Sequence, residues 1–147
     1  MWQSVAPTTF AHVSDLHIGL DPRTNRAAEQ LCESLLDEQP ALVLCTGDVT
    51  HRGRRDELER FRDIFHPLLR TGRMLVVPGN HDRLGDDLHR DLMPGERVQA
   101  ERHGGLWVVR LDSSGPHNRR WVDSHGLVTP QDIDDVVEAL APDLMPA

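Results

Sequence analysis

Three short motifs in this chain carry the side chains that most often bind metal ions. They are Asp15-Leu16-His17, Gly47-Asp48 and Gly79-Asn80-His81-Asp82. Together they contribute three carboxylates, two imidazoles and one carboxamide. Mixed oxygen and nitrogen ligands suit borderline divalent ions such as Mn, Fe, Co, Ni or Zn, whereas Ca and Mg sites are built from oxygen. One or two such ions can activate a water molecule and hold phosphoryl oxygens, so the motifs predict metal-assisted hydrolysis of phosphoesters.

The first two motifs have the local geometry of a shared site. Asp15 and His17 are two positions apart, so near a strand end both side chains point the same way. Gly47 permits a sharp turn before Asp48. The two oxygens of the Asp48 carboxylate can each bind one ion, which predicts a bridging ligand between two metals.

In the third motif, the polar side chains follow a glycine that permits a turn. Asn80 offers a neutral oxygen to an ion. His81 is then placed to face a substrate, and Asp82 is available to orient the His81 ring. We therefore expect metal binding at Asn80 and catalytic roles for His81 and Asp82.

Each motif follows a predicted strand of an α/β fold. The pattern predicts strands over 9–14, 41–45 and 74–77, and helices over 26–38 and 54–69 between them. Such strand–helix units form parallel strands with right-handed crossovers. Because ligands gather beyond the carboxyl ends of parallel strands, we expect the three motifs to meet along one edge of the sheet.

The remaining chain predicts a hairpin and two further helices. A short helix is expected over 84–93, strands over 97–103 and 106–111 joined by Gly104-Gly105, and a helix from Pro130 that Pro142 ends. Apolar spacing predicts the buried helix faces. The residues that form these faces are Ala27, Leu31, Leu35 and Leu36 in the first helix, Leu58, Phe61, Phe65 and Leu68 in the second, and Ile133, Val136, Val137 and Leu140 in the last.

Composition excludes several classes of protein. The 147 residues suit one domain, 1–147, and the formal net charge of −8 argues against general nucleic-acid binding. No apolar segment is long enough to cross a membrane, and the N-terminus has no signal-peptide pattern. Cys32 and Cys45 lie in apolar surroundings and are expected to be buried thiols in a reducing compartment. We therefore expect a cytoplasmic protein.

Seven further histidines stand outside the three motifs. None of them belongs to a recognisable ligand pair, so we expect surface or loop positions for them. They are His12, His51, His66, His89, His103, His117 and His125.

The motifs resemble those of a known family. Ser14-Asp15-Leu16-His17, Thr46-Gly47-Asp48 and Pro78-Gly79-Asn80-His81-Asp82 are similar, in order and spacing, to the first three motifs of the calcineurin-like metallophosphoesterases. Leu111-Asp112-Ser113 and the loop that follows resemble the phosphodiesterase-like branch. The resemblance extends from Phe10 to Ala141.

This resemblance implies roles for the individual residues. Asp15 and His17 would bind the first of two divalent ions, Asp48 would bridge both, and Asn80 would bind the second. His81 would stabilise the transition state or protonate the leaving group, with Asp82 behind it.

The resemblance also implies a four-layer α/β/β/α sandwich whose ligand set a later Gly-His-x-His motif completes. No such motif occurs before Ala147. We therefore expect an incomplete, C-terminally truncated sandwich, with the first βαβαβ sheet, part of the second sheet and an incomplete second metal site.

The sequence thus indicates the N-terminal portion of a metal-dependent phosphoesterase that acts on a small-molecule or nucleotide phosphoester. The alternative is an inactive remnant or partner-binding module of the same fold, because an unfinished sheet edge invites self-association. A Rossmann-type nucleotide-binding domain is disfavoured, since no Gly-rich loop follows the first strand.

Overall fold

A three-stranded parallel sheet forms the centre of the chain. The computed structural model describes residues 8–103, 105–115 and 126–144. The strands follow one another in the order β1 (Phe10–Val13), β2 (Leu42–Thr46) and β3 (Met74–Val77). All three lie within or next to the predicted segments. The apolar run in β2 is buried from both sides, as a central strand between two layers requires.

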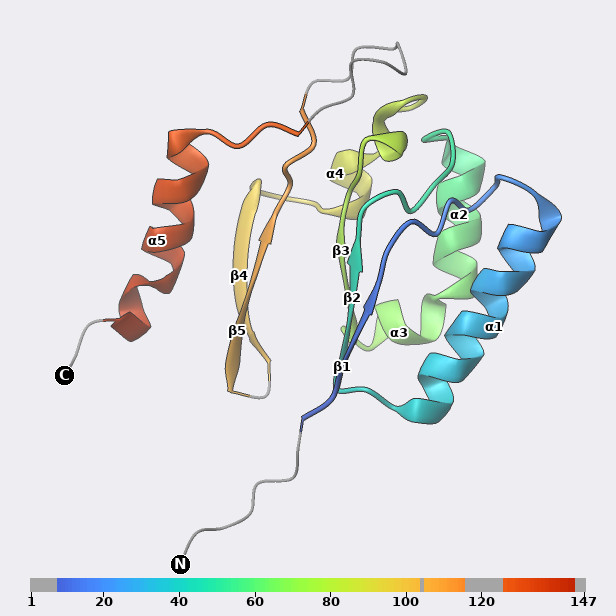
Figure 1. Cartoon of the computed structure of the whole chain (residues 1–147), viewed down its shortest axis with the longest axis horizontal. Helices are drawn as coiled ribbons and strands as arrows, with labels where there is room; N and C mark the ends of the chain where they lie inside the picture. Colours follow the sequence, from blue (N-terminus) through green and yellow to red (C-terminus); the bar gives the residue numbers. More distant parts are fainter. Residues whose placement is uncertain (1–7, 104, 116–125, 145–147) are drawn as a thin grey trace, which may run out of the picture.

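Three helices cover one face of this sheet (Figure 1): α1 (Pro22–Glu38), α2 (Arg55–Ile64) and α3 (His66–Arg70). Helix α1 begins earlier than predicted because Asp21 caps it. The Asp21 carboxylate accepts hydrogen bonds from the backbone nitrogens of Arg23 and Thr24 at 2.7 and 2.8 Å. Pro22 fits the first turn, where a missing N–H costs nothing.

The single helix predicted over 54–69 is divided in two at Phe65. Phe65 leaves helical geometry, with φ −95° and ψ 11°, and Pro67 supplies no N–H to continue the ladder. The predicted inner face is nevertheless confirmed. Its four apolar side chains are all buried: Leu58, Phe61, Phe65 and Leu68.

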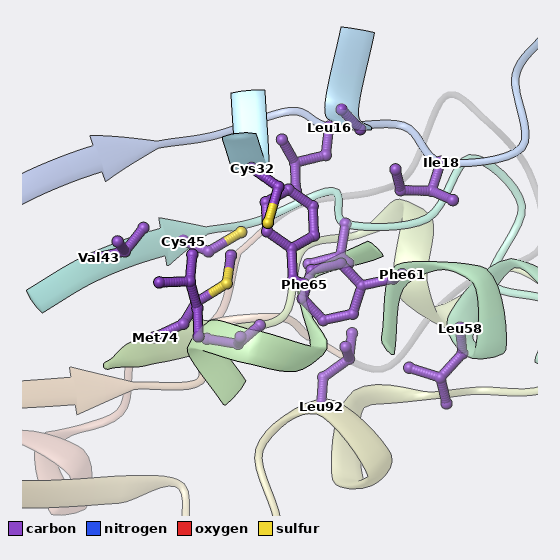
Figure 2. Packing of buried hydrophobic residues seen from close by; sticks show 14 of the residues in the cluster. Leu16, Ile18, Cys32, Val43, Cys45, Leu58, Phe61, Phe65, Met74 and Leu92 are labelled. Carbon is purple, nitrogen blue, oxygen red and sulfur yellow. The ribbon is translucent and has the colours of Figure 1, made fainter. Parts of the chain in front are cut away.

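The hydrophobic core lies between these helices and the sheet (Figure 2), where Cys32, Cys45, Phe61 and Phe65 pack together with Met74. Both cysteines are free and buried, as predicted. The predicted apolar face of α1 is confirmed except at Ala27: Leu35 is buried, and Leu31 and Leu36 are partly buried against the core. Ala27 is exposed, and the buried residues of the helix also include Ala28 and Cys32.

A second, two-stranded sheet packs against the other face of the parallel sheet. Its antiparallel strands are β4 (Val98–His103) and β5 (Leu106–Leu111), close to the predicted hairpin. In Arg110, Nη1 donates to the Val76 carbonyl at 3.2 Å, and Nη2 donates to Glu101 Oε1 at 3.0 Å. This guanidinium therefore links the hairpin to β3.

Helix α5 (Pro130–Leu144) covers the outer side of the hairpin, which completes four layers in the order helices, sheet, hairpin, helix (Figure 1). The predicted α/β/β/α arrangement is thus present in partial form. Over 84–93, where a helix was predicted, the structure has only the four-residue α4 (His89–Leu92). The short 3₁₀ helix η1 (His81–Arg83) lies just before this segment. None of the helices in the described part of the chain is long and apolar enough to span a bilayer.

Two predictions about α5 were wrong. The helix continues past Pro142, because a proline so near the end disturbs only the last turn. Ile133 and Val137, predicted to pack in the core, are each 57% exposed. The physical reason is that α5 packs on a sheet of only two strands. This sheet is too narrow to cover the whole apolar stripe of the helix, so one side of the stripe faces solvent.

Candidate metal centre

The loops that follow β1, β2 and β3 are joined by backbone hydrogen bonds beyond the strand ends. The Asp15 nitrogen donates to the Gly47 carbonyl at 3.2 Å, and the His17 nitrogen donates to the Asp48 carbonyl at 2.9 Å. The Gly47 nitrogen donates to the Val77 carbonyl at 2.8 Å. The three motifs therefore meet at one edge of the parallel sheet, as the sequence predicted.

Three residues of this edge have left-handed backbone conformations. The φ angles of Asp15, His17 and Asp48 are 56°, 45° and 47°. Each such residue costs about 1–3 kcal/mol when it is not glycine. The hydrogen bonds between the loops hold these conformations in place. Strain concentrated in three neighbouring polar residues is typical of a functional site.

Asp15, His17 and Asp48 form a group that could hold a metal ion. One ligand atom from each lies within 4.8 Å of the other two. The His17 Nε2 lies 3.9 Å from Asp15 Oδ1, and Ser14 Oγ donates a hydrogen bond to Asp15 Oδ2. The His17 Nδ1 atom is buried and has no hydrogen-bond partner among the described residues. Two carboxylates beside an imidazole fit a borderline divalent ion.

The third motif packs directly against Asp48. The His81 backbone nitrogen donates to Asp48 Oδ1 at 3.0 Å. Gly79 passes so close that a Cβ atom there would collide with the Asp48 carboxylate and backbone nitrogen. Glycine is therefore required at this position for the β3 loop to reach Asp48.

The His81 ring is held by a backbone carbonyl. Its Nδ1 donates to the His51 carbonyl at 2.7 Å, because a carbonyl oxygen only accepts. The ring therefore carries its proton on Nδ1 when neutral. The expectation that Asp82 orients this ring is not met, since both Asp82 oxygens bind other groups.

Asp82 is fully buried beneath the site. Its Oδ2 accepts hydrogen bonds from the nitrogens of Val49 and Gly79 at 3.2 and 2.8 Å. Its Oδ1 accepts two from Thr50, from the nitrogen and from Oγ1, each at 2.7 Å. Burial raises the pKa of this carboxyl, while the four hydrogen bonds act to lower it. Asp82 thus ties the β2 loop to the β3 loop from below.

Asn80 is exposed and lines a neighbouring cavity. The cavity has a volume of about 280 Å³, and its walls include Thr46, Pro78 and, from the segment after β5, Ser113 and Ser114. Of the predicted site residues, the structure thus gathers Asp15, His17 and Asp48 with His81 beside them. Asn80 stands at the cavity wall, and Asp82 lies underneath.

His51 is a residue of this edge that sequence reasoning missed. Its ring centroid lies 5.7 Å from that of His17 and 5.6 Å from that of His81. Burial, with the nearby His81 and His17, lowers the pKa of His51. The available signal was its position in the same loop as Asp48. The interpretation as an ordinary surface or loop histidine was therefore incomplete.

The other histidines give no comparable group among the residues that the structure describes. His12 and His66 are exposed. His89 pairs with Asp87, and His103 pairs with Glu101. The remaining two, His117 and His125, lie outside the described residues.

Comparison with known proteins gives a family match over nearly the whole chain. Residues 8–143 match the calcineurin-like phosphoesterases. The chain is 35% identical over 110 residues to the 3',5'-cyclic adenosine monophosphate phosphodiesterase CpdA of Pseudomonas aeruginosa, covering 73% of this chain and 39% of that protein. It is 26% identical over 145 residues to a probable cyclic nucleotide phosphodiesterase of Pseudoalteromonas sp. strain SM9913, covering 92% and 52%.

A third relative is a probable cyclic nucleotide phosphodiesterase of Synechococcus sp., 30% identical over 118 residues, or 74% of this chain and 45% of that protein. The chain therefore spans about half the length of these curated relatives, or less.

Proposed function

Because the chain belongs to the calcineurin-like phosphoesterase family, we propose that it carries the metal-binding part of an enzyme that hydrolyses small phosphoesters. The observation that carries this proposal is the grouping of Asp15, His17 and Asp48 at the carboxyl edge of the sheet. The names of the relatives support cyclic nucleotides as candidate substrates.

Two divalent ions, as in the family, would share Asp48 as a common ligand. Asp15, His17 and Asp48 are the proposed ligands of the first ion, and Asp48 with Asn80 those of the second. When bound, such ions supply an activated water and neutralise charge on the phosphoryl oxygens. Mn, Fe, Co, Ni and Zn all suit these ligands.

His81 and Asp82 have different proposed tasks. The hydrogen bond from His81 Nδ1 to the His51 carbonyl aims the opposite side of the ring, with Nε2, away from that carbonyl. Because the neutral ring carries its proton on Nδ1, the imidazolium form is the one with a proton on Nε2 as well. We assign this Nε2 proton to transfer to the leaving-group oxygen or to stabilisation of the transition state. Asp82 acts as a positioning residue, since its carboxylate holds the backbone on either side of the site.

Metal-dependent hydrolysis of an aryl phosphodiester, bis-(4-nitrophenyl) phosphate, tests this function. The chain is freed of metal, supplied with each divalent ion in turn, and compared with the Asp48→Asn variant. Asp134→Asn is the matched control, because Asp134 is exposed on α5. Activity in the chain and the control but not in Asp48→Asn is expected. Equal activity in all three, or none with any ion, would contradict the proposal.

The alternative function is a partner-binding module, with a second copy of the chain as the partner. The exposed side chains of Ile133 and Val137 on α5 favour it. Light scattering over a concentration series measures the mass of the particle. Self-association that Ile133→Asp and Val137→Asp together abolish would support this alternative, and a monomer at every concentration would exclude it.

The proposed compartment is the cytoplasm. Cys32 and Cys45 are free and buried, and burial raises the pKa of Cys45 to about 12. Such thiols suit a reducing compartment. Fractionation of cells that produce the chain at native level tests this assignment.

A further inference from the structure

We propose that His17, His51 and His81 form an additional cation position, built from imidazole alone, beside the position of Asp15, His17 and Asp48. One ring nitrogen from each residue lies within 4.8 Å of the other two. The ring centroids of His17 and His81 are 4.7 Å apart, and His51 closes the triangle.

The unpartnered nitrogen atoms support this position. The Nδ1 atoms of His17 and His51 are buried, and neither has a hydrogen-bond partner in the described part of the chain. A buried polar nitrogen without a partner costs about 1–3 kcal/mol. Two such atoms on neighbouring rings, which lie edge to face at 73°, are explained if a cation binds them.

His81 has the hydrogen-bond pattern of a metal-binding histidine. Ligating histidines usually donate one ring N–H to a carbonyl, which orients the ring and leaves the second nitrogen toward the metal. His81 donates from Nδ1 to the carbonyl of His51 at 2.7 Å. One ligand of the proposed position thus orients another.

The backbone around His51 is fixed in place. The His51 nitrogen donates to the Ile18 carbonyl at 3.0 Å, and the next residue, Arg52, donates from its nitrogen to the buried Glu57 carboxylate at 2.9 Å. The imidazole therefore stands on a rigid loop. A tetrahedral ion with metal–nitrogen bonds of 2.0–2.1 Å needs nitrogens about 3.3 Å apart, so modest side-chain rotations complete the geometry.

The ligand chemistry selects the cation. Three neutral imidazoles suit Zn²⁺, Ni²⁺ or Cu²⁺ and offer nothing to Mg²⁺ or Ca²⁺. His17 belongs to both positions, so an ion in one competes with an ion in the other for this ring. An ion on His81 Nε2 also excludes the proton that the proposed function assigns to that atom. The inference goes beyond the proposed function and does not depend on it, because binding can be measured in an inactive chain.

The test separates the two positions by substitution. Asp48→Asn removes a carboxylate and leaves all three imidazoles, and Asp15→Asn does the same if Asp48→Asn fails to fold. Cu²⁺ is titrated into each metal-free variant, and electron paramagnetic resonance counts the coordinating imidazole nitrogens. We expect one Cu²⁺ with three imidazoles.

Adding His51→Gln to Asp48→Asn should leave two imidazoles and weaken Cu²⁺ binding at least about tenfold. Adding His66→Gln instead is the matched control, because His66 is exposed on α3. Circular dichroism verifies folding of each variant. The same affinity and nitrogen count in both double variants would overturn the inference, as would failure of folded Asp48→Asn and Asp15→Asn chains to bind Cu²⁺. Absence of hydrolysis in the unmodified chain with every divalent ion, together with Cu²⁺ binding to the three imidazoles in Asp48→Asn, would contradict the proposed function alone.

Discussion

Gly79 and Asp48 are in contact, and the contact is possible only because glycine has no Cβ atom. A Cβ at Gly79 would overlap the Asp48 side chain and backbone. The lack of a side chain at Gly79 therefore determines how closely the Gly79-Asn80-His81-Asp82 motif approaches the proposed metal ligand Asp48. The stability of the fold and the geometry of the site depend on the same contact.

Gly79→Ala should therefore both destabilise the chain and weaken metal binding. Overpacking of this kind costs about 1–3 kcal/mol. Urea unfolding measures the first effect, and calorimetric titration with Zn²⁺ measures the second. Gly72→Ala is the control, because Gly72 has φ +67° but open space around its Cα. It should lose on the order of 1 kcal/mol and bind Zn²⁺ as the unmodified chain does. A Gly79→Ala chain with unchanged Zn²⁺ affinity would contradict the argument.

Replacement of Asp82 should be among the most damaging single changes. In Asp82→Asn, the amide can no longer accept from donors on both sides, so at least one buried N–H loses its partner. The free energy of unfolding should fall by about 3 kcal/mol. Denaturant titration checks this, with exposed Asp134→Asn expected to change it by less than about 0.5 kcal/mol. A loss as small as the control's would show that the carboxylate does not tie the loops together.

Acid should weaken the anchoring of α5. Hydrogen bonds from the nitrogen and Oγ1 of Thr129, with the charge of Arg97, lower the pKa of Asp132 from 3.8. Because the folded-state pKa lies below the unfolded one, the stabilisation is complete above pH 3.8 and is lost as the pH falls through the folded value. Hydrogen exchange of α5 between about pH 5 and 2 would measure this loss.

The pH dependence should disappear from α5 in Asp132→Asn and persist in Asp134→Asn. Both residues lie in the same helix, and only Asp132 binds Thr129 and Arg97 in the structure. Equal acid sensitivity in the two variants would assign the effect to another group.

Divalent metal should stabilise the chain through His17. A ligand present at 100 times its dissociation constant adds about 2.7 kcal/mol to the free energy of unfolding. Zn²⁺ should thus raise the melting temperature, and a chelator should reverse the rise. His17→Gln should abolish the response, whereas His12→Gln should keep it, since His12 is exposed and its ring binds Thr46 Oγ1. A shift that survives His17→Gln would place the ion elsewhere.

The sequence predicted the convergence of the three motifs because strand ends in a parallel sheet share one edge. It also predicted the buried face of 58, 61, 65 and 68, since spacing in a helix maps directly onto a face. It missed the position of His51, which depends on how the loop after β2 turns to bring this ring next to those of His17 and His81. The partners of Asp82 were missed for the same reason, because they come from backbone nitrogens that no side-chain pattern marks.

The left-handed conformations of Asp15, His17 and Asp48 have a consequence for evolution and engineering. A residue that tolerates positive φ, such as glycine, would relax the backbone at each of these positions, so a chain that abandons the ligands could gain thermal robustness. A screen for heat resistance alone would therefore tend to select replacements of Asp15, His17 and Asp48.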